Sequence, residues 1–532
     1  MEQFDYIIVG AGSAGCVLAE RLSADGRHNV LLLEAGGTDR RFDVRVPIGY
    51  GRLFHDPSVN WRFRSEPEPG LDGRAIYWPR GKLLGGSSAI NAMVYIRGLP
   101  GDFADWQAAG NPGWGPAEAA AAFERMERRI AADGTPTGAG ALWVSDCAAQ
   151  YHKLGRHYLA AAQEAGFPPG DTVSAEGVGP YALTTRRGRR HSAADAFLRP
   201  ALRRRNLRLV TAAEVLGATL DGLRATGVRY RRHGQLHEAR CRAEVVLSAG
   251  AVKSPQLLQL SGIGPGALLA SMGIEVVRDA PGVGGALQDH LGMTYAFRAS
   301  EPSLNQVLGR FRGKAAAALR YVLFRDGPFS LGVNQMGGMV RSDPGLPRAD
   351  IQLYCNPLSY STVYRNRRPL LAPDPWPGFC IGFNPCRPTS RGRIDIASPD
   401  PHAAPLIVPN SLSTDTDIAL MLAGARVVER LLETEAMRGL VTAANGFSPA
   451  AQTDAAILAD IRARAGTVYH PCGTCRMAPA VAGGVVDPAL RVHGVAGLRV
   501  ADASIFPNIT SANTNAPTLM VAMKAADIIL GG

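Results

Sequence analysis

The chain has 532 residues, 46% of them hydrophobic and 19% charged, a composition typical of a globular protein of about two to four domains. Its eight cysteines are too few for a disulfide scaffold, and no run of about eighteen uncharged apolar residues predicts a membrane span. The net charge is +11, and basic residues cluster at 186–190, 203–205 and 229–232. These clusters are better explained as solvated surface than as a site for an acidic partner or an anionic membrane. No nucleic-acid module accompanies them.

The strongest local pattern lies near the N-terminus. The apolar run 6–9 predicts a buried strand that leads into Gly10-x-Gly12-x-x-Gly15 and a helix, and a second apolar run ends on Glu34. In such a unit the first glycine permits the tight turn, the second admits a pyrophosphate and the third lets helix and strand pack closely. The acid accepts a ribose hydroxyl. The pattern predicts a dinucleotide site, most simply for an adenosine diphosphate group.

This pattern begins within ten residues of Met1, so we expect no signal peptide. The cysteines are then expected to be reduced thiols of a cytoplasmic protein.

Two further glycine-rich segments follow. Gly85-Gly86-Ser87-Ser88 offers N–H and hydroxyl donors without bulk, which suits close approach to a phosphate or a planar ring. Residues 244–251 repeat the strand-to-glycine design and lead into a helix whose first position we assign to Pro255. Other predicted elements are helices over 117–127 and 153–165, and strands over 207–210 and 225–230 with a hairpin turn at Asp221-Gly222.

A glycine turn at 281–290 carries Asp289 and His290. His290 is a candidate catalytic residue, although a histidine beside an aspartate in such a turn is more often a structural hydrogen-bonding group. From 296 to 464 the chain shows many prolines, short strand-like runs such as 351–354 and 393–396, and a helical stretch over 415–432. These features predict a second domain built on an antiparallel sheet, which we expect to determine substrate choice.

Recognisable chemistry returns near the C-terminus. His470 lies in Val-Tyr-His-Pro-Cys-Gly-Thr-Cys, and a strand-like run ends at Asp502. Asn513 then precedes an apolar helix, in which we place Pro517 at the first position. The N-terminal dipole of this helix would favour negative charge, such as that of a reduced flavin.

Taken in order, four motifs resemble the glucose–methanol–choline oxidoreductases, which are FAD enzymes. They are the N-terminal fingerprint, the segments 81–94 and 250–264, and the pair of loops over 470–515. The resemblance covers 4–295 and 465–530. It implies a mixed α/β fold with a Rossmann-like FAD-binding domain (1–295 with 465–532) and a substrate-binding domain (296–464).

The same resemblance implies roles for individual residues. His470 would be the general base, because a neutral imidazole accepts the alcohol proton, and Asn513 would hold the hydroxyl while hydride passes to flavin N5. The residues assigned to FAD are Gly10, Gly12, Ser13, Gly15 and Glu34 at the ADP half, Gly86, Asn91, Ala92, Met93 and Val94 along the flavin, Val215 at the adenine, and Asp502, Ala503, Asn515, Pro517 and Thr518 at the flavin's polar edge.

The sequence also argues against a covalent bond to FAD and against a metal or disulfide site. Ile90 stands where some family members attach FAD through a histidine, so we expect non-covalent FAD. Cys472-Gly-Thr-Cys475 has the spacing of half a zinc site or a redox pair, but no second cysteine pair completes a tetrahedral set. We therefore expect neither a metal nor a disulfide there.

The favoured function is that of an FAD-dependent alcohol dehydrogenase similar to bacterial choline and aliphatic alcohol dehydrogenases. Its partners would be a small-molecule alcohol and an electron acceptor, namely a quinone, a redox carrier or oxygen. An oxidase that forms hydrogen peroxide and a non-redox hydroxynitrile lyase remain alternatives, whereas the C-terminal cofactor motifs disfavour a nicotinamide enzyme. We expect no nucleic-acid partner and no membrane span, while peripheral membrane association stays open.

Overall fold

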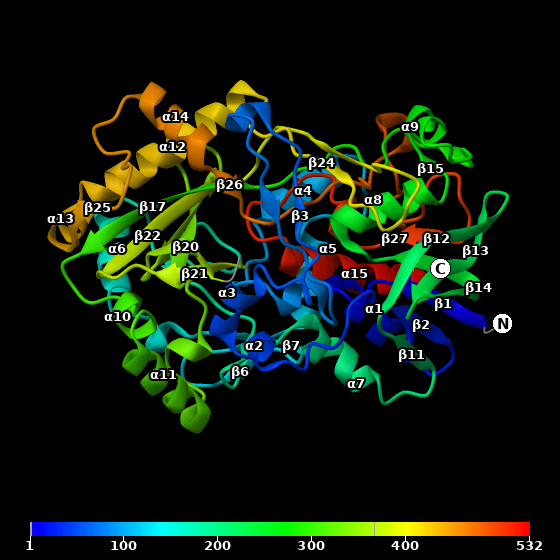
Figure 1. Ribbon diagram of the computed structural model, residues 1–532, viewed down its shortest axis with the longest axis horizontal. Coiled ribbons are helices and arrows are strands. Elements are labelled where there is room, and N and C mark those ends of the chain that lie inside the picture. Colours follow the sequence, from blue (N-terminus) through cyan, green and yellow to red (C-terminus); the bar gives the residue numbers. More distant parts are fainter. Residues whose placement is uncertain (1–2, 366–367, 532) are drawn as a thin grey trace.

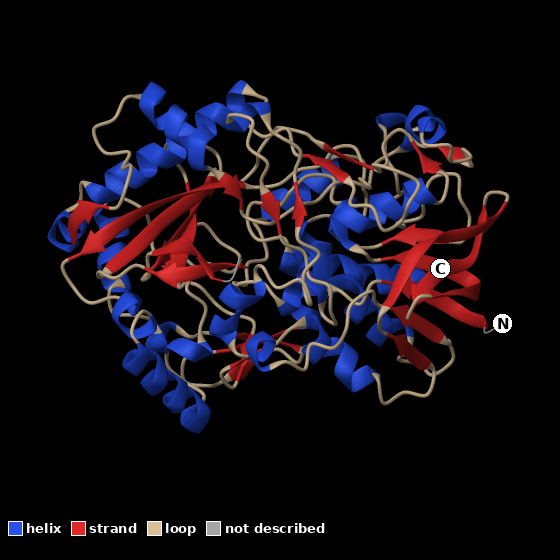
Figure 2. Cartoon of the chain, in the orientation of Figure 1, coloured by secondary structure: helices blue, strands red, loops and turns tan. Residues whose placement is uncertain are grey.

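The computed structural model describes residues 3–365 and 368–531, and most of its long strands belong to two large sheets (Figures 1 and 2). Both chain ends lie beside the first sheet, at the right of Figure 1. The second sheet forms the core of the opposite end of the molecule. The predicted mixed α/β class with a second, antiparallel sheet is confirmed.

The first sheet has the strand order β11-β2-β1-β14-β13-β12, with β27 pairing β14. Its strands are β1 (Gln3–Val9), β2 (Val30–Leu33), β11 (Leu207–Val210), β12 (Ala213–Asp221), β13 (Arg224–Arg232), β14 (Gln235–Leu247) and β27 (Leu498–Val500). β1 pairs in parallel with β2 and β14, and β27 pairs in parallel with the end of β14. β12, β13 and the start of β14 form an antiparallel ribbon whose first turn contains Gly222, as predicted.

Burial explains why these segments are strands. Every residue of β2 is buried, as expected for a parallel strand covered on both faces. The helix α1 (Ser13–Leu22) begins directly after the glycine turn and packs against α15 (Asn515–Gly531), the last helix of the chain (Figure 1). The two ends of the sequence therefore share one hydrophobic core.

The second sheet has the order β25-β17-β22-β19-β18-β8, with β26 pairing β17, and all its pairings are antiparallel. Its strands are β8 (Gly177–Pro180), β17 (Leu291–Ala299), β18 (Met336–Val340), β19 (Ile351–Asn356), β22 (Gly378–Pro385), β25 (Val441–Ala444) and β26 (Gly466–Thr467). The helices α6 (Gly155–Glu164), α12 (Asp415–Leu432), α13 (Glu435–Leu440) and α14 (Asp454–Arg464) gather around this sheet (Figure 1). The domain boundaries at 295 and 465 stay predictions.

Further helices and short strand pairs lie outside the two large sheets. The remaining α-helices in the described residues are α2 (Phe42–Arg45), α3 (Tyr50–Leu53), α4 (Pro100–Ala108), α5 (Pro116–Met126), α7 (Arg199–Ala201), α8 (Gly250–Leu260), α9 (Gly266–Ser271), α10 (Leu304–Leu308) and α11 (Phe311–Phe324). The small strand pairs include β3 (Phe63–Arg64) with β4 (Tyr77–Trp78), β20 (Tyr360–Arg365) with β21 (Arg368–Pro373), and β23 (Arg393–Asp395) with β24 (Leu406–Val408).

Both predicted proline positions are wrong. Pro255 lies inside α8, which already begins at Gly250. A proline there leaves the carbonyl of Ala251 without its helical donor, and the Thr474 hydroxyl donates to that oxygen instead, at 2.6 Å. Pro517 is the third residue of α15 rather than the first. The first four N–H groups of a helix have no partner within it, so a proline in that turn removes no helical bond.

Candidate active site

A single large cavity of about 1840 Å³ brings together most of the residues singled out from the sequence. Its lining includes Gly10, Gly12, Ser13, Glu34, Gly86, Asn91, Ala92, Met93, Val94, Val215, Asp502, Ala503, Asn515 and Thr518, together with His470 and Asn513. Two predicted residues, Gly15 and Pro517, are absent from the lining. Cavities for one small ligand measure roughly 300–1,000 Å³, so this one has room for a dinucleotide and a second molecule.

The end of the cavity beside β1 and β2 has the features of a dinucleotide cradle. Glu34 is buried at the end of β2, and its two oxygens accept from the backbone N–H groups of Ala11 (2.9 Å) and Gly36 (2.8 Å). Burial raises the pKa of Glu34 to about 7, although these two donors favour the charged form. Each carboxylate oxygen keeps a further lone pair that can accept a ribose hydroxyl.

Close glycine contacts shape the same end. Gly86 has a φ of +52°, and a Cβ built on it would lie 2.7 Å from the Cα of Gly12. The two backbones therefore approach as only glycine allows, and both border the cavity. A Cβ on Gly15 would lie 1.8 Å from the carbonyl oxygen of Gly10. Gly15 thus serves the packing of the turn on the helix rather than lining the cavity.

A buried arginine supports the wall formed by residues 86–94. Arg190 Nη1 donates to Asn91 Oδ1 at 2.7 Å and to the carbonyl of Ser88 at 3.2 Å, and its Nε donates to the carbonyl of Val44 at 3.0 Å. Asn91 Oδ1 also accepts the N–H of Met93 at 3.1 Å, which helps to hold Met93 in a left-handed conformation with φ 65°. The wall is therefore fixed by side chains from behind it.

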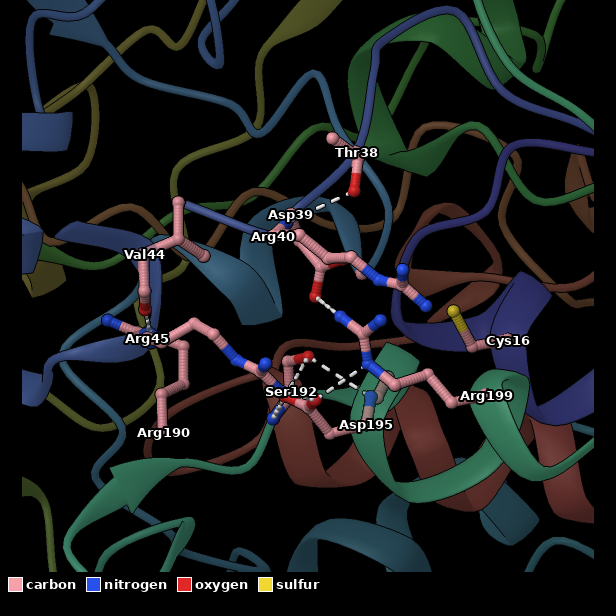
Figure 3. A network of polar contacts seen from close by, with 12 residues as sticks. Cys16, Thr38, Asp39, Arg40, Val44, Arg45, Arg190, Ser192, Asp195 and Arg199 are labelled. Carbon is pink, nitrogen blue, oxygen red and sulfur yellow. Dashed lines mark hydrogen bonds and ion pairs between the residues drawn. The ribbon is translucent and has the colours of Figure 1, made fainter. Parts of the chain in front are cut away.

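Figure 3 shows the polar network in which Arg190 takes part. Asp195 accepts from Arg45 at 3.1 Å and from Arg199 Nε at 2.8 Å, and Arg199 also pairs with Asp39. These contacts tie the loop after Glu34 to the segment 190–199. The network thereby joins the dinucleotide end of the cavity to the wall at Asn91.

The C-terminal segment closes the cavity from the other side. Asp502 accepts from the N–H of Gly250 at 2.8 Å and from the hydroxyl of Ser254 at 2.6 Å. Ser13 donates to Asn515 Oδ1 at 2.8 Å, which links the start of α1 to the start of α15. The N-termini of both helices therefore meet at the cavity and offer unpaired N–H groups to an anionic ligand.

His470 and Asn513 lie side by side at the end of the cavity nearer the second sheet, where Asn513 Nδ2 is 3.1 Å from His470 Nε2. Gln352 in β19 donates to Asn513 Oδ1 at 3.2 Å, which turns the amide nitrogen of Asn513 toward the histidine. The preceding residue, Tyr469, has a left-handed φ of 72°, and its carbonyl accepts from Arg80 at 2.7 Å. This strained turn aims the imidazole into the cavity.

A second histidine determines the tautomer of His470. His290 Nε2 is 3.0 Å from the carbonyl of Cys386, which can only accept, so Nε2 carries the proton of His290. Burial lowers the pKa of His290 to about 4, so its Nδ1 is an unprotonated acceptor, 3.0 Å from His470 Nδ1. His470 therefore donates through Nδ1 and presents the lone pair of Nε2 to Asn513 and the cavity.

Burial and, to a lesser extent, nearby charges favour the neutral form of His470. Burial, reinforced by His290 and Arg80, lowers the pKa of His470 well below its usual value. Asp289 accepts from the backbone N–H of His470 at 2.7 Å and from the Thr467 hydroxyl, and burial raises the pKa of this carboxyl to about 7. Asp289 does not line the cavity. It holds the loop, and the neutral imidazole of His470 faces the cavity.

The cavity is electropositive. Seven cationic residues line it, namely Arg52, Arg62, Arg64, Arg80, Lys253, Lys314 and Arg464, against four carboxylates among the described residues. Each carboxylate is already engaged: Glu34 and Asp502 by the donors given above, Asp43 by Arg41, and Glu214 by Lys253 at 3.8 Å. An anionic cofactor is favoured, and a cationic second ligand meets no free counter-charge in the described lining.

The two cysteines of the 472–475 loop are buried free thiols, and burial raises the pKa of both. His493, a histidine that follows this loop in the sequence, contacts a backbone group instead, with its Nε2 2.9 Å from the carbonyl of Ala478.

The sequence did not identify the supporting residues Arg80, Arg190 and Gln352. The glycine turn makes His290 a candidate, but the sequence does not indicate its contact with His470. These residues carry no local motif, because their roles depend on long-range contacts that only the fold creates.

Comparison with known proteins finds models of one family that match the N-terminal and C-terminal parts of the chain. The N-terminal and C-terminal models of the GMC oxidoreductase family match residues 4–292 and 388–522. An alcohol dehydrogenase [acceptor] of Pseudomonas putida is 41% identical over 99% of this chain and 96% of its own length. The mitochondrial choline dehydrogenase of Homo sapiens is 39% identical over 100% of this chain and 90% of its own. The crystal structure of pyridoxine 4-oxidase from Mesorbium loti superposes with a TM-score of 0.87 at 31% identity, covering 98% of both chains.

Proposed function

The chain belongs to the GMC oxidoreductase family, and from this membership we propose that it oxidises the CH–OH group of an alcohol to an aldehyde or ketone. FAD is its cofactor. When bound, FAD supplies an acceptor at N5 for the hydride of the carbinol carbon. The observation that carries the proposal is the His470–Asn513 pair, which borders the same cavity as the dinucleotide cradle.

The residues present fit FAD. We place the pyrophosphate at the close approach of Gly12 and Gly86 and the adenosine ribose at Glu34, because a Cβ would fill the first place and the second offers free lone pairs. Residues 91–94 would line the flavin ring, and Asn515 and Thr518 its polar side. Ile90 offers no nucleophile to the ring, so we propose non-covalent binding.

The chain's own residues handle the proton. An alcohol hydroxyl between His470 and Asn513 would donate to Nε2 and accept from Asn513 Nδ2. The lowered pKa keeps His470 ready to accept at neutral pH, and His290 accepts from Nδ1 so that the ring does not turn. Gln352 fixes the amide of Asn513. Catalysis by this chain is thus the positioning of one hydroxyl and the removal of its proton.

The electropositive lining narrows the substrate class. We propose a neutral alcohol rather than choline, because the described lining holds no unengaged carboxylate for a quaternary ammonium group. Electrons would leave to a quinone or another redox carrier, by analogy with the relative named alcohol dehydrogenase [acceptor].

The test is anaerobic reduction of the purified flavoprotein by a panel of alcohols, followed by the visible spectrum. His470→Ala should retain FAD but reduce it about 10²–10⁴-fold more slowly. His470→Gln is the matched control for loss of the base with the ring volume largely kept, and it should be equally slow. Near-normal reduction in both variants, or a wild-type spectrum that no alcohol bleaches, would reject the proposal, and the second result would favour lyase chemistry.

A further inference from the structure

The helix α11 exposes an unusual amount of apolar surface. Among its residues only Ala317 and Tyr321 are buried. Phe311 is 86% exposed, Leu319 60%, Val322 55%, Leu323 62% and Phe324 71%. Figure 1 shows α11 projecting from the body of the molecule, at the lower left. A cluster of large apolar side chains on one projecting helix indicates an interaction surface.

Four of the five exposed apolar side chains share one face of the helix, and the fifth, Phe324, is the last residue of the helix. Phe311, Leu319, Val322 and Leu323 fall within about a third of a helical turn, on the side opposite Ala317 and Tyr321. The segment 310–325 also carries five basic residues and no acidic residue. They are Arg310, Arg312, Lys314, Arg320 and Arg325, and of these Arg320 pairs with Asp326 at 2.7 Å. The segment therefore combines an apolar face with a net positive charge.

We propose that α11 lies in the surface of an anionic lipid bilayer and docks the enzyme there. Helices that lie in the membrane interface combine a bulky apolar face with Lys and Arg side chains that reach the lipid phosphates. With 14 residues, α11 is about 21 Å long, which suits a helix lying along a membrane. In the part of the chain that the structure describes, no helix has the length and apolarity needed to cross a bilayer.

Charge decides between a bilayer and a second copy of the chain. A symmetric dimer through this face would set the same patch against itself, and its basic side chains would face one another. Like charges brought together in a partly desolvated contact oppose association. An anionic bilayer instead supplies acyl chains for the phenylalanines and leucines and phosphates for the arginines.

The docking face adjoins the cavity. Leu308 just before α11, Lys314 within it and Phe329 just after it line the cavity, whereas the exposed Leu323 and Phe324 do not. Docking would therefore bring one edge of the cavity to the lipid, where an apolar alcohol or a bilayer-dissolved electron acceptor is concentrated. The docking itself does not depend on the proposed reaction.

The experiment is co-sedimentation of the FAD-loaded enzyme with vesicles of phosphatidylglycerol and phosphatidylcholine, or of phosphatidylcholine alone. The wild type should bind the anionic vesicles, and binding should weaken as salt is raised. Leu323→Glu/Phe324→Glu should lower the partition coefficient at least about tenfold, by loss of apolar area and added charge repulsion. The matched control is Leu236→Glu, since Leu236 is 63% exposed at the start of β14.

A second variant tests the charge separately. Arg310→Gln/Arg312→Gln should weaken binding about 25-fold, at about fivefold per arginine, and only on anionic vesicles. All three variants should turn over a water-soluble alcohol with a dye acceptor as the wild type does, because none of these residues lines the cavity.

Three outcomes would overturn the proposal. They are no wild-type binding to anionic vesicles, equal binding by the wild type and the Leu323→Glu/Phe324→Glu variant, and a soluble wild-type dimer that this variant splits.

Discussion

Replacing His290 by leucine removes the acceptor of the His470 Nδ1 proton while keeping a buried side chain of similar size. In the wild type the two Nδ1 atoms are 3.0 Å apart, and the Nε2 of His290 is held by the carbonyl of Cys386. Without His290, the Nδ1–H of His470 loses its partner inside the protein. The imidazole is then free to rotate or to change tautomer, and Nε2 no longer faces the substrate as a lone pair.

The size of the effect follows from the buried donor. A buried polar group left without its hydrogen-bond partner costs about 1–3 kcal/mol. If this cost falls on the reactive tautomer and orientation, flavin reduction should slow by about 5- to 150-fold, since about 1.4 kcal/mol corresponds to a factor of ten in rate. The effect should appear in the rate of reduction at saturating alcohol, with a smaller change in the apparent substrate affinity.

The assay is anaerobic stopped-flow reduction of His290→Leu, with FAD content measured first. His290→Asn is the matched control, because its Oδ1 can occupy the place of Nδ1 and accept from His470. This variant should recover a large part of the rate. A leucine variant that binds FAD and reduces it within twofold of the wild type would show that His470 does not need this contact. Equal losses in the leucine and asparagine variants would assign His290 a purely structural role.

Three further predictions concern the pH profile, the cofactor cradle and the substrate. The lowered pKa of His470 means that its neutral form persists on acidification, so the acid limb of the kcat/KM profile should lie below pH 6.5. Asp289, whose pKa is raised to about 7, is the nearby group that titrates near neutral pH. A limb near pH 7 that persists in Asp289→Asn would therefore contradict the prediction for His470. Gly12→Val should purify without FAD, since its side chain would enter the gap facing Gly86. The control Gly439→Val should be yellow, because no atom lies within 4 Å of its added Cβ. Normal FAD content in Gly12→Val would show that the pyrophosphate does not lie at this glycine. The neutral isostere 3,3-dimethylbutan-1-ol should exceed choline in kcat/KM by about tenfold or more, and the reverse order would refute the electrostatic assignment of the substrate.

Local patterns in the sequence were enough to predict much of the fold. The strands at 6–9 and 30–33, the turn at Gly222 and the helix over 415–432 are defined by neighbouring residues, and all are present. The two misplaced prolines show where local rules fail. A proline at the start of a helix is the commoner arrangement, but Pro255 is tolerated in mid-helix because Thr474, distant in sequence, satisfies the freed carbonyl.

Some residues of the candidate site have a sequence signature and others have none. His470, Asn513 and the glycine motifs have sequence signatures, and the structure gathers them at one cavity. Gln352, which orients Asn513, comes from a strand that was predicted without any role. Nothing around Gln352 in the sequence distinguishes it from an ordinary strand residue, because its function exists only once β19 lies beside the C-terminal loops. The basic, apolar segment 310–325 was missed because its exposure, rather than its composition, makes it unusual.

The bond between Ser13 and Asn515 spans 502 positions of the chain and has a consequence for synthesis. The glycine turn and Glu34 leave the ribosome early, but the C-terminal side of the cofactor cradle does not exist until α15 has been made. At about 5–20 residues per second, the gap between these events is roughly half a minute to a minute and a half. During that interval α1 exposes the apolar surface that packs against α15 in the finished chain. Cofactor capture therefore waits for α15, and the nascent chain must stay unaggregated without FAD until that helix has been made.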